Sequence, residues 1–64
     1  MQIRDSHGRL VGKIVHSDNN TQEAYDQNGV YVGTYNESAD VTLDKFGRLV
    51  GKGNSLAYLI WDDN

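Results

Sequence analysis

The sequence contains no cysteine, only two histidines and no long apolar run. These absences argue against disulfides, a structural metal site and a membrane-spanning helix. Without cysteine, disulfides cannot stabilise the fold and the redox compartment cannot be read. The two histidines, His7 and His16, are too few to favour a structural metal site. No apolar run approaches the roughly 18 residues of a membrane helix, and the first five residues show no signal region. We therefore expect no membrane partner. If Met1 is the native start we expect a cytoplasmic protein, whereas a fragment would leave the location undetermined.

Basic residues are missing from the middle of the chain. From Ile14 to Asp44 there is no lysine or arginine, but six acids lie there: Asp18, Glu23, Asp26, Glu37, Asp40 and Asp44. The net charge is −3, which does not give the positive footprint that a nucleic-acid backbone requires, so we expect no nucleic-acid partner. The acidic middle is interpreted as a solvated surface, with association between it and the basic flanks as the alternative.

The chain has 64 residues, which we interpret as one small domain, residues 1–64. A chain of this length buries only about 60% of the surface that its unfolded form exposes. Small domains usually gain stability from disulfides, a metal or oligomerisation. Because the composition argues against the first two, we expect a homo-oligomer.

An eight-residue phrase, Asp-x-x-Gly-x-x-Val-Gly, occurs three times, starting at Asp5, Asp26 and Asp44. Its first and third copies share the string Gly-Arg-Leu-Val-Gly-Lys, at residues 8–13 and 47–52. An aspartate that begins a turn accepts bonds from nearby backbone amides, and glycine at the fourth position takes a left-handed conformation. These positions are assigned structural turn roles: Asp5, Gly8, Asp26, Gly29, Asp44 and Gly47.

The residues around each phrase are β-branched or aromatic, and no stretch keeps a clean helical period, which predicts an all-β domain. The predicted repeats cover about 1–16, 22–36 and 40–53, with polar loops at 16–22 and 36–40. The apolar segment 56–61 predicts a seventh strand, buried or at an interface. Asp62 lies 18 residues after Asp44, so residues 55–64 are interpreted as half of a fourth repeat. We expect the hairpins to curl into a radial or barrel-like antiparallel sheet.

The turn geometry also predicts which residues share a face. With each aspartate numbered 0, position +4 should lie opposite 0, +5 opposite −1, and +6 opposite −2. One face then carries the +5 and −1 residues and those that follow them: Leu10, Arg4, Tyr31, Tyr25, Leu49, Leu43, Ile14 and Tyr35. The other face carries the valines and the −2 residues: Val11, Val32, Val50, Ile3, Ala24 and Thr42. Because basic residues flank Val11 and Val50, we expect the leucine and tyrosine face to be the core, although a slip of one residue would reverse this. The glycines at +7 (Gly12, Gly33 and Gly51) indicate a bend or a close approach of backbone.

The phrase Tyr-Asp-x-x-Gly-x-x-Val-Gly, best developed from Tyr25 to Gly33, resembles that of small bacterial β-hairpin-repeat proteins, including four-fold β-flowers. The resemblance implies an all-β assembly of radially arranged hairpins with no established activity or cofactor. This chain departs from a four-fold pattern because the second strand of the fourth hairpin is missing.

The motifs favour no catalytic, cofactor or metal site. Residues 8–13 differ from a phosphate loop in glycine spacing, and Ile14 stands where a magnesium-binding Ser or Thr would be needed. The recurring aspartates lack a calcium-loop pattern, and no Ser or Cys is spaced as a partner for either histidine. We therefore assign no catalytic, cofactor-binding or metal residues, and an enzyme is the weakest of three hypotheses.

The first hypothesis is a non-enzymatic module that self-associates as a structural or protein-interaction domain. Its candidate interface or ligand residues are Leu56, Tyr58, Ile60, Trp61, Val11, Val32 and Val50. The alternative is a module that binds a glycan or another cell-surface ligand through tyrosine and Trp61, because these side chains combine a large apolar area with a polar tip.

Overall fold

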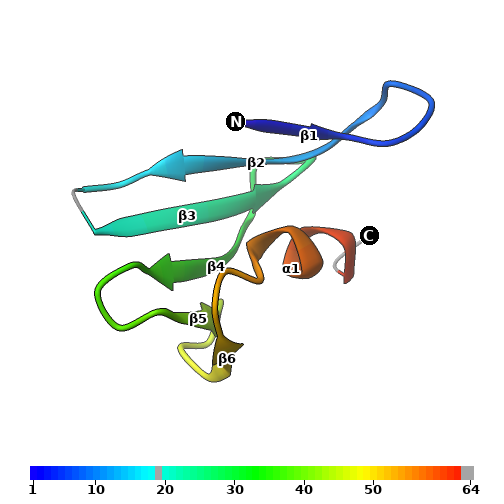
Figure 1. The fold of residues 1–64 in the computed structure, drawn as a ribbon. Coiled ribbons are helices and arrows are strands. Elements are labelled where there is room, and N and C mark those ends of the chain that lie inside the picture. Colours follow the sequence, from blue (N-terminus) through cyan, green and yellow to red (C-terminus); the bar gives the residue numbers. More distant parts are fainter. Residues whose placement is uncertain (19, 63–64) are drawn as a thin grey trace.

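The computed structural model describes residues 1–18 and 20–62, and within them it forms six strands and one short helix. The elements are β1 (Gln2–Arg4), β2 (Leu10–His16), β3 (Thr21–Asp26), β4 (Tyr31–Asn36), β5 (Val41–Asp44), β6 (Leu49–Lys52) and α1 (Leu56–Asp62). The strands form one antiparallel sheet in chain order (Figure 1), which confirms the predicted antiparallel β sheet, whereas α1 departs from the all-β prediction. The sheet does not close into a barrel, because β1 and β6 remain its two edges. Residues 63 and 64 of the predicted last repeat lie outside the described residues.

Each copy of the phrase lies at the turn of a hairpin: β1–β2, β3–β4 and β5–β6. In the second hairpin the amide of Gly29 donates to the Asp26 carbonyl at 3.0 Å, and the Asp26 amide donates to the Val30 carbonyl at 2.9 Å. The first and third turns repeat both bonds. The glycine at the fourth position has φ near +80° in every copy, a conformation that disfavours other residues: Gly8 (78°), Gly29 (80°) and Gly47 (80°).

The pairing follows the predicted register as far as position +5 and then departs from it. Tyr31 lies opposite Tyr25, as predicted, but Gly33 rather than Val32 lies opposite Ala24. The same one-residue step occurs at the valine of the other two hairpins, Val11 and Val50. The prediction that +6 lies opposite −2 is therefore wrong, because a β-bulge at each valine moves the partner to +7.

The bulges also overturn the predicted choice of core face. Val11 and Val32 are buried and Ala24 is fully covered, so the valine side of the sheet carries the core. Beyond the bulge Ile14 joins that side, opposite Ala24, while Lys13 lies opposite Tyr25 on the far side. The basic residues that flank Val11 in the sequence predict a solvated valine face. The bulge at Val11 reverses the alternation of side chains along β2, so Lys13 points away from the core.

The predicted seventh strand is wrong, because residues 56–62 form the helix α1. Asn54 caps this helix: its side-chain oxygen accepts the Leu56 amide at 3.1 Å. The buried Thr42 hydroxyl donates to the Gly53 carbonyl at 2.6 Å and accepts the Ser55 amide at 3.0 Å. These bonds turn the chain away from β6, so the apolar segment crosses the sheet instead of extending it.

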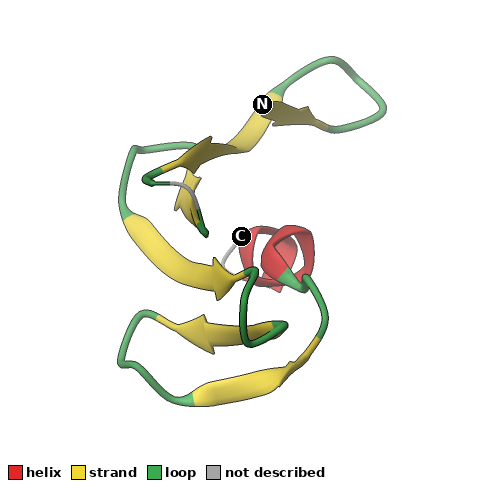
Figure 2. Ribbon diagram, turned by 60° about the vertical axis from the view of Figure 1, so that its left-hand side comes forward, coloured by secondary structure: helices red, strands yellow, loops and turns green. Residues whose placement is uncertain are grey.

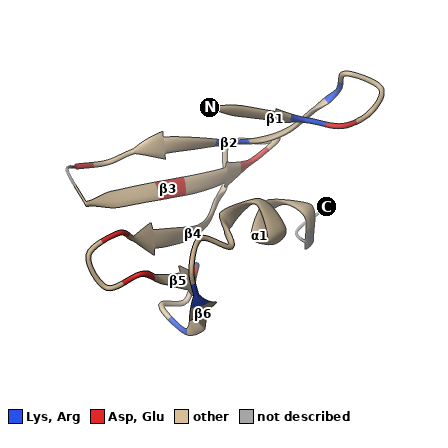
Figure 3. Ribbon diagram, viewed as in Figure 1, with Lys and Arg blue, Asp and Glu red and all other residues tan. Residues whose placement is uncertain are grey.

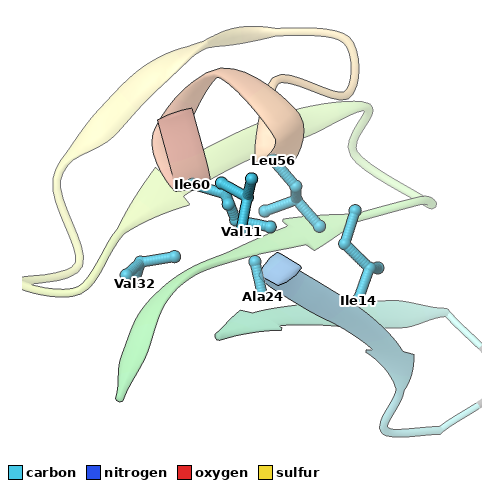
Figure 4. Packing of buried hydrophobic residues seen from close by; sticks show 6 residues of the cluster. All are labelled: Val11, Ile14, Ala24, Val32, Leu56 and Ile60. Atoms are coloured by element: carbon cyan, nitrogen blue, oxygen red, sulfur yellow. The ribbon is translucent and has the colours of Figure 1, made fainter. Parts of the chain in front are cut away.

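Helix α1 packs on the side of the sheet formed by β2, β3 and β4, and the strands curve around it (Figure 2). Leu56 and Ile60, four residues apart and therefore on one helix face, are fully buried. The core that they complete is small, as Figure 4 shows, and consists of Val11, Ile14, Ala24, Val32, Leu56 and Ile60. Two +7 glycines permit the close contact: a Cβ at Gly12 would lie 2.6 Å from Ile60 Cγ2, and one at Gly33 would lie 2.5 Å from Leu59 Cδ1.

Candidate functional site

The structure divides the predicted interface residues into two groups. Four of them lie in the core between the sheet and α1: Leu56, Ile60, Val11 and Val32. The other three are exposed: Tyr58, Trp61 and Val50. Because a buried side chain cannot reach a partner, only the exposed group, with its neighbours, can form a contact surface.

The three aspartates of the phrase accept hydrogen bonds from backbone amides of the turns in which they lie. In the third hairpin, Asp44 Oδ1 accepts the amides of Phe46 and Arg48, both at 2.9 Å. Asp5 and Asp26 accept the equivalent pairs of amides at 2.8 to 3.0 Å. Hydrogen bonds from the backbone amides of Arg9 and Arg48 hold the pKa values of Asp5 and Asp44 below their ordinary value. This geometry explains the aspartates by turn structure, without a ligand.

The third hairpin differs from the first although they share six consecutive residues. Val11 is 5% exposed, whereas its counterpart Val50 is 37% exposed and the adjacent Leu49 is 67% exposed. A Cβ at Gly51 would meet nothing within 4 Å, whereas one at Gly12 would collide with α1. The same sequence is thus covered in one place and open in the other.

A basic aromatic tip continues this open region. Phe46 is 71% exposed, with Lys45 Nζ 5.6 Å and Arg48 Cζ 5.1 Å from its ring centroid. Such distances permit cation–π attraction. We call Phe46, Leu49 and Val50, with their basic neighbours Lys45, Arg48 and Lys52, the third-hairpin surface.

Three acidic residues without a basic neighbour in sequence, Asp18, Glu37 and Asp40, lie at the opposite ends of the strands, in the β2–β3 and β4–β5 connectors (Figure 3). The amide of Glu37 donates to the Asn20 carbonyl at 2.7 Å, so the two connectors lie side by side. Glu37 Oε2 also accepts Gln22 Nε2 at 3.0 Å and lies 3.3 Å from His16 Nε2. We call the three acids here, Asp18, Glu37 and Asp40, the acidic connector end.

The side of the sheet opposite α1 carries a second apolar strip, which the sequence had suggested was the core. Tyr25 and Tyr31 pack edge to face with ring centroids 6.0 Å apart, and Lys13 Nζ lies 5.6 Å from the Tyr25 ring. Burial raises the pKa values of both tyrosines, with Glu23 adding to the effect. Leu43 and the exposed Leu49, which lie opposite each other in β5 and β6, belong to the same side of the sheet.

Tyr58 and Trp61 form a separate small patch on the outer side of α1. They are 62% and 49% exposed, and a spacing of three residues makes them neighbours on a helix surface. The predicted grouping of these two residues with Val50 is therefore spread over two elements, α1 and β6.

The described residues offer no group of three or more His, Asp or Glu side chains that could hold a metal ion. Within the same residues, no helix has the length and apolarity needed to cross a membrane. Comparison of the chain with protein-family models, curated proteins and solved structures finds no match.

Proposed function

We propose that this protein is a non-enzymatic β-hairpin-repeat module of three hairpins that self-associates as a structural or protein-interaction domain. We propose that its contact is the third-hairpin surface. The observation that carries the proposal is the contrast between two identical strings: Val11 is covered in the first hairpin, but Val50 and Leu49 are open in the third. A second copy would cover the open string, residues 47–52, and add buried apolar surface to a domain whose own core is small.

Contact through side chains fits this molecule better than extension of the sheet. β1 has three residues and includes Arg4, while β6 has four residues, a bulge at Val50 and a lysine at its end. Short, charged and bulged edges are the devices by which proteins oppose edge-to-edge pairing. These devices oppose the pairing of backbones but leave the exposed side chains of Phe46, Leu49 and Val50 accessible to a partner.

The resemblance of the phrase at Tyr25–Gly33 to small bacterial β-hairpin-repeat proteins supports the same proposal, because those proteins are assemblies of hairpins. The resemblance implies no activity and no cofactor. We place the chain with them as part of this proposal.

Sedimentation velocity over the micromolar range tests the proposal. We expect a reversible, concentration-dependent oligomer, and Leu49→Ser should weaken it about tenfold because it removes an apolar contact from the interface. Val30→Ser is the matched control, since Val30 is also exposed but lies in the turn of the second hairpin. A chain that stays monomeric at every concentration would refute the proposal.

A second candidate, binding of a glycan or another cell-surface ligand, is favoured by the exposed pair Tyr58 and Trp61. Aromatic rings exposed side by side can stack on sugar rings while their polar tips form hydrogen bonds. The chain has one tryptophan, so a change in its fluorescence during a glycan titration reports on Trp61 alone. Fluorescence that stays constant while the tryptophan remains accessible to a quencher would exclude this site.

A further inference from the structure

We propose that two copies associate antiparallel about a two-fold axis, with the basic tip of each third hairpin lying against the acidic connector end of the other. This inference rests on the proposed self-association and names the surface that receives the tip. Its basis is an arrangement of charge and apolar area along one strip of the molecule.

This strip runs along the third hairpin of one chain, from the tip of the hairpin to the acidic connector end. The third hairpin begins at the tip with Lys45 and Phe46, and β6 then runs back to Lys52, which lies opposite Val41. Immediately after it, the amide of Gly53 donates to the carbonyl of Asp40 at 2.8 Å. The open string is therefore basic at the tip, and at its other extremity Lys52 lies beside the acidic connector end, where the three carboxylates of Asp18, Glu37 and Asp40 outnumber it.

A strip with opposite charges at its ends is complementary to itself when one copy is reversed. In a two-fold arrangement, Lys45 of each copy faces Glu37 and Asp40 of the other, next to Arg48, whose Nε also donates to Asp44 Oδ2 of its own turn at 2.9 Å. Leu49, which lies between the two ends on the side of β6 opposite α1, then meets its counterpart near the axis, and Val50, at the bulge, borders this contact from the other side of the strand. The same contact forms twice, so the assembly closes as a dimer and does not grow into a filament.

Phe46 is the apolar anchor of this contact. Its position in the turn is occupied by His7 and Asn28 in the other two hairpins, and all three residues donate the same amide bond to their aspartate. The turn therefore does not need a phenyl ring at this position. A large apolar side chain left exposed between two cations fits a role in binding an acidic surface.

The test is a charge swap measured by sedimentation equilibrium. The wild-type dimer should weaken about tenfold between low and high salt, because screening reduces the attraction between the tip and the connector. Lys45→Glu alone and Glu37→Lys alone should each dissociate the dimer. An equimolar mixture of the two variants should form a heterodimer of near wild-type affinity, since the two reversed side chains meet each other in one contact and the other contact keeps its native pair of charges.

Two matched controls separate this contact from a general effect of charge or folding. Lys13→Glu changes the net charge by the same amount at an exposed site of the first hairpin, and should leave the dimer intact. Phe46→Asn should weaken the dimer, whereas His7→Asn at the equivalent position should not. Circular dichroism and thermal melts check that each variant remains folded.

The outcomes distinguish the two proposals. A dimer that resists salt and both charge reversals would overturn the antiparallel contact and leave self-association standing. A chain that never dimerises would remove both proposals, and binding of that monomer to vesicles of anionic lipid would assign the basic tip to a membrane surface instead.

Discussion

Gly12, Gly33 and Gly51 occupy the same position of the repeated phrase but differ in what lies over them. Side chains of α1 and carbonyls of the neighbouring strands, those of Tyr25 and Leu43, leave no room for a Cβ at the first two, and the space over the third is open. The three sites therefore form a series in which each glycine follows the bulged valine and the surrounding packing differs.

We expect Gly12→Ala and Gly33→Ala each to lower the free energy of unfolding by about 1–3 kcal/mol, because the added methyl group collides both with a side chain of α1 and with a carbonyl of the neighbouring strand. Gly51→Ala should raise it by less than about 1 kcal/mol, because the space at this site is open and alanine loses less conformational freedom on folding than glycine. Urea denaturation measures all three. Equal losses at the three sites would contradict the packing difference that separates Gly51 from the other two glycines.

The turn aspartates predict how stability depends on pH. The pKa values of Asp5 and Asp44 lie below the ordinary value of 3.8 in the folded protein, mainly because backbone amides donate to the ionised carboxylates. A depressed pKa contributes stability that is present above about pH 4 and is lost as the pH falls through the lower folded value.

We therefore expect the melting temperature to fall on acidification below about pH 4, and to fall less steeply in Asp44→Asn, which has no charge to lose. Thermal melts across this range, followed by circular dichroism, measure both slopes. An unchanged slope in Asp44→Asn would contradict the assigned role of its carboxylate.

At the scale of elements, the hairpins were readable from the sequence but the helix was not. The recurring Asp and Gly define three turns because they act through local hydrogen bonds and a positive φ, which depend only on neighbouring residues. Residues 56–61 form a short apolar run, and such a run does not distinguish a buried strand from a helix. The signals that favour the helix were the cap at Asn54 and the four-residue spacing of Leu56 and Ile60.

The choice of core face failed for a related reason. A bulge at Val11, Val32 and Val50 shifts the alternation of side chains between the two sides of the sheet by one residue. The residues of the phrase do not predict this bulge. Once the bulge is included, Lys13 points away from the core and Ile14 joins it, so burial agrees with residue type. The candidate contact was predicted only in part, because Val50 was named but exposed Phe46 and Leu49 were not.

The helix supplies a further prediction. Ile60→Ala should lower the free energy of unfolding by about 2–5 kcal/mol, because Ile60 is fully buried against the sheet and its loss leaves a cavity. Tyr58→Ala, on the exposed side of the same helix, should change it by less than about 1 kcal/mol. Chemical denaturation measures both values. Similar values for the two variants would show that α1 does not pack on the sheet through Ile60.

At the scale of the whole molecule, the core lies on one side of the sheet and is built from few residues. Small domains of this kind gain from any further burial of apolar surface. The two sheet edges are short and charged, while the third hairpin presents uncovered apolar side chains next to basic ones. Association through side chains of that hairpin would therefore stabilise the domain without extending the sheet.

The most direct test of this account compares the two identical strings within one sample by amide hydrogen exchange. Raising the protein concentration should slow exchange in residues 47–52 and in the acidic connectors, because a second copy covers them. Exchange in residues 8–13 should not change, since the first hairpin lies outside the contact. Exchange in both strings that is independent of concentration, or protection that rises equally in both, would contradict the claim that the third hairpin is the contact surface.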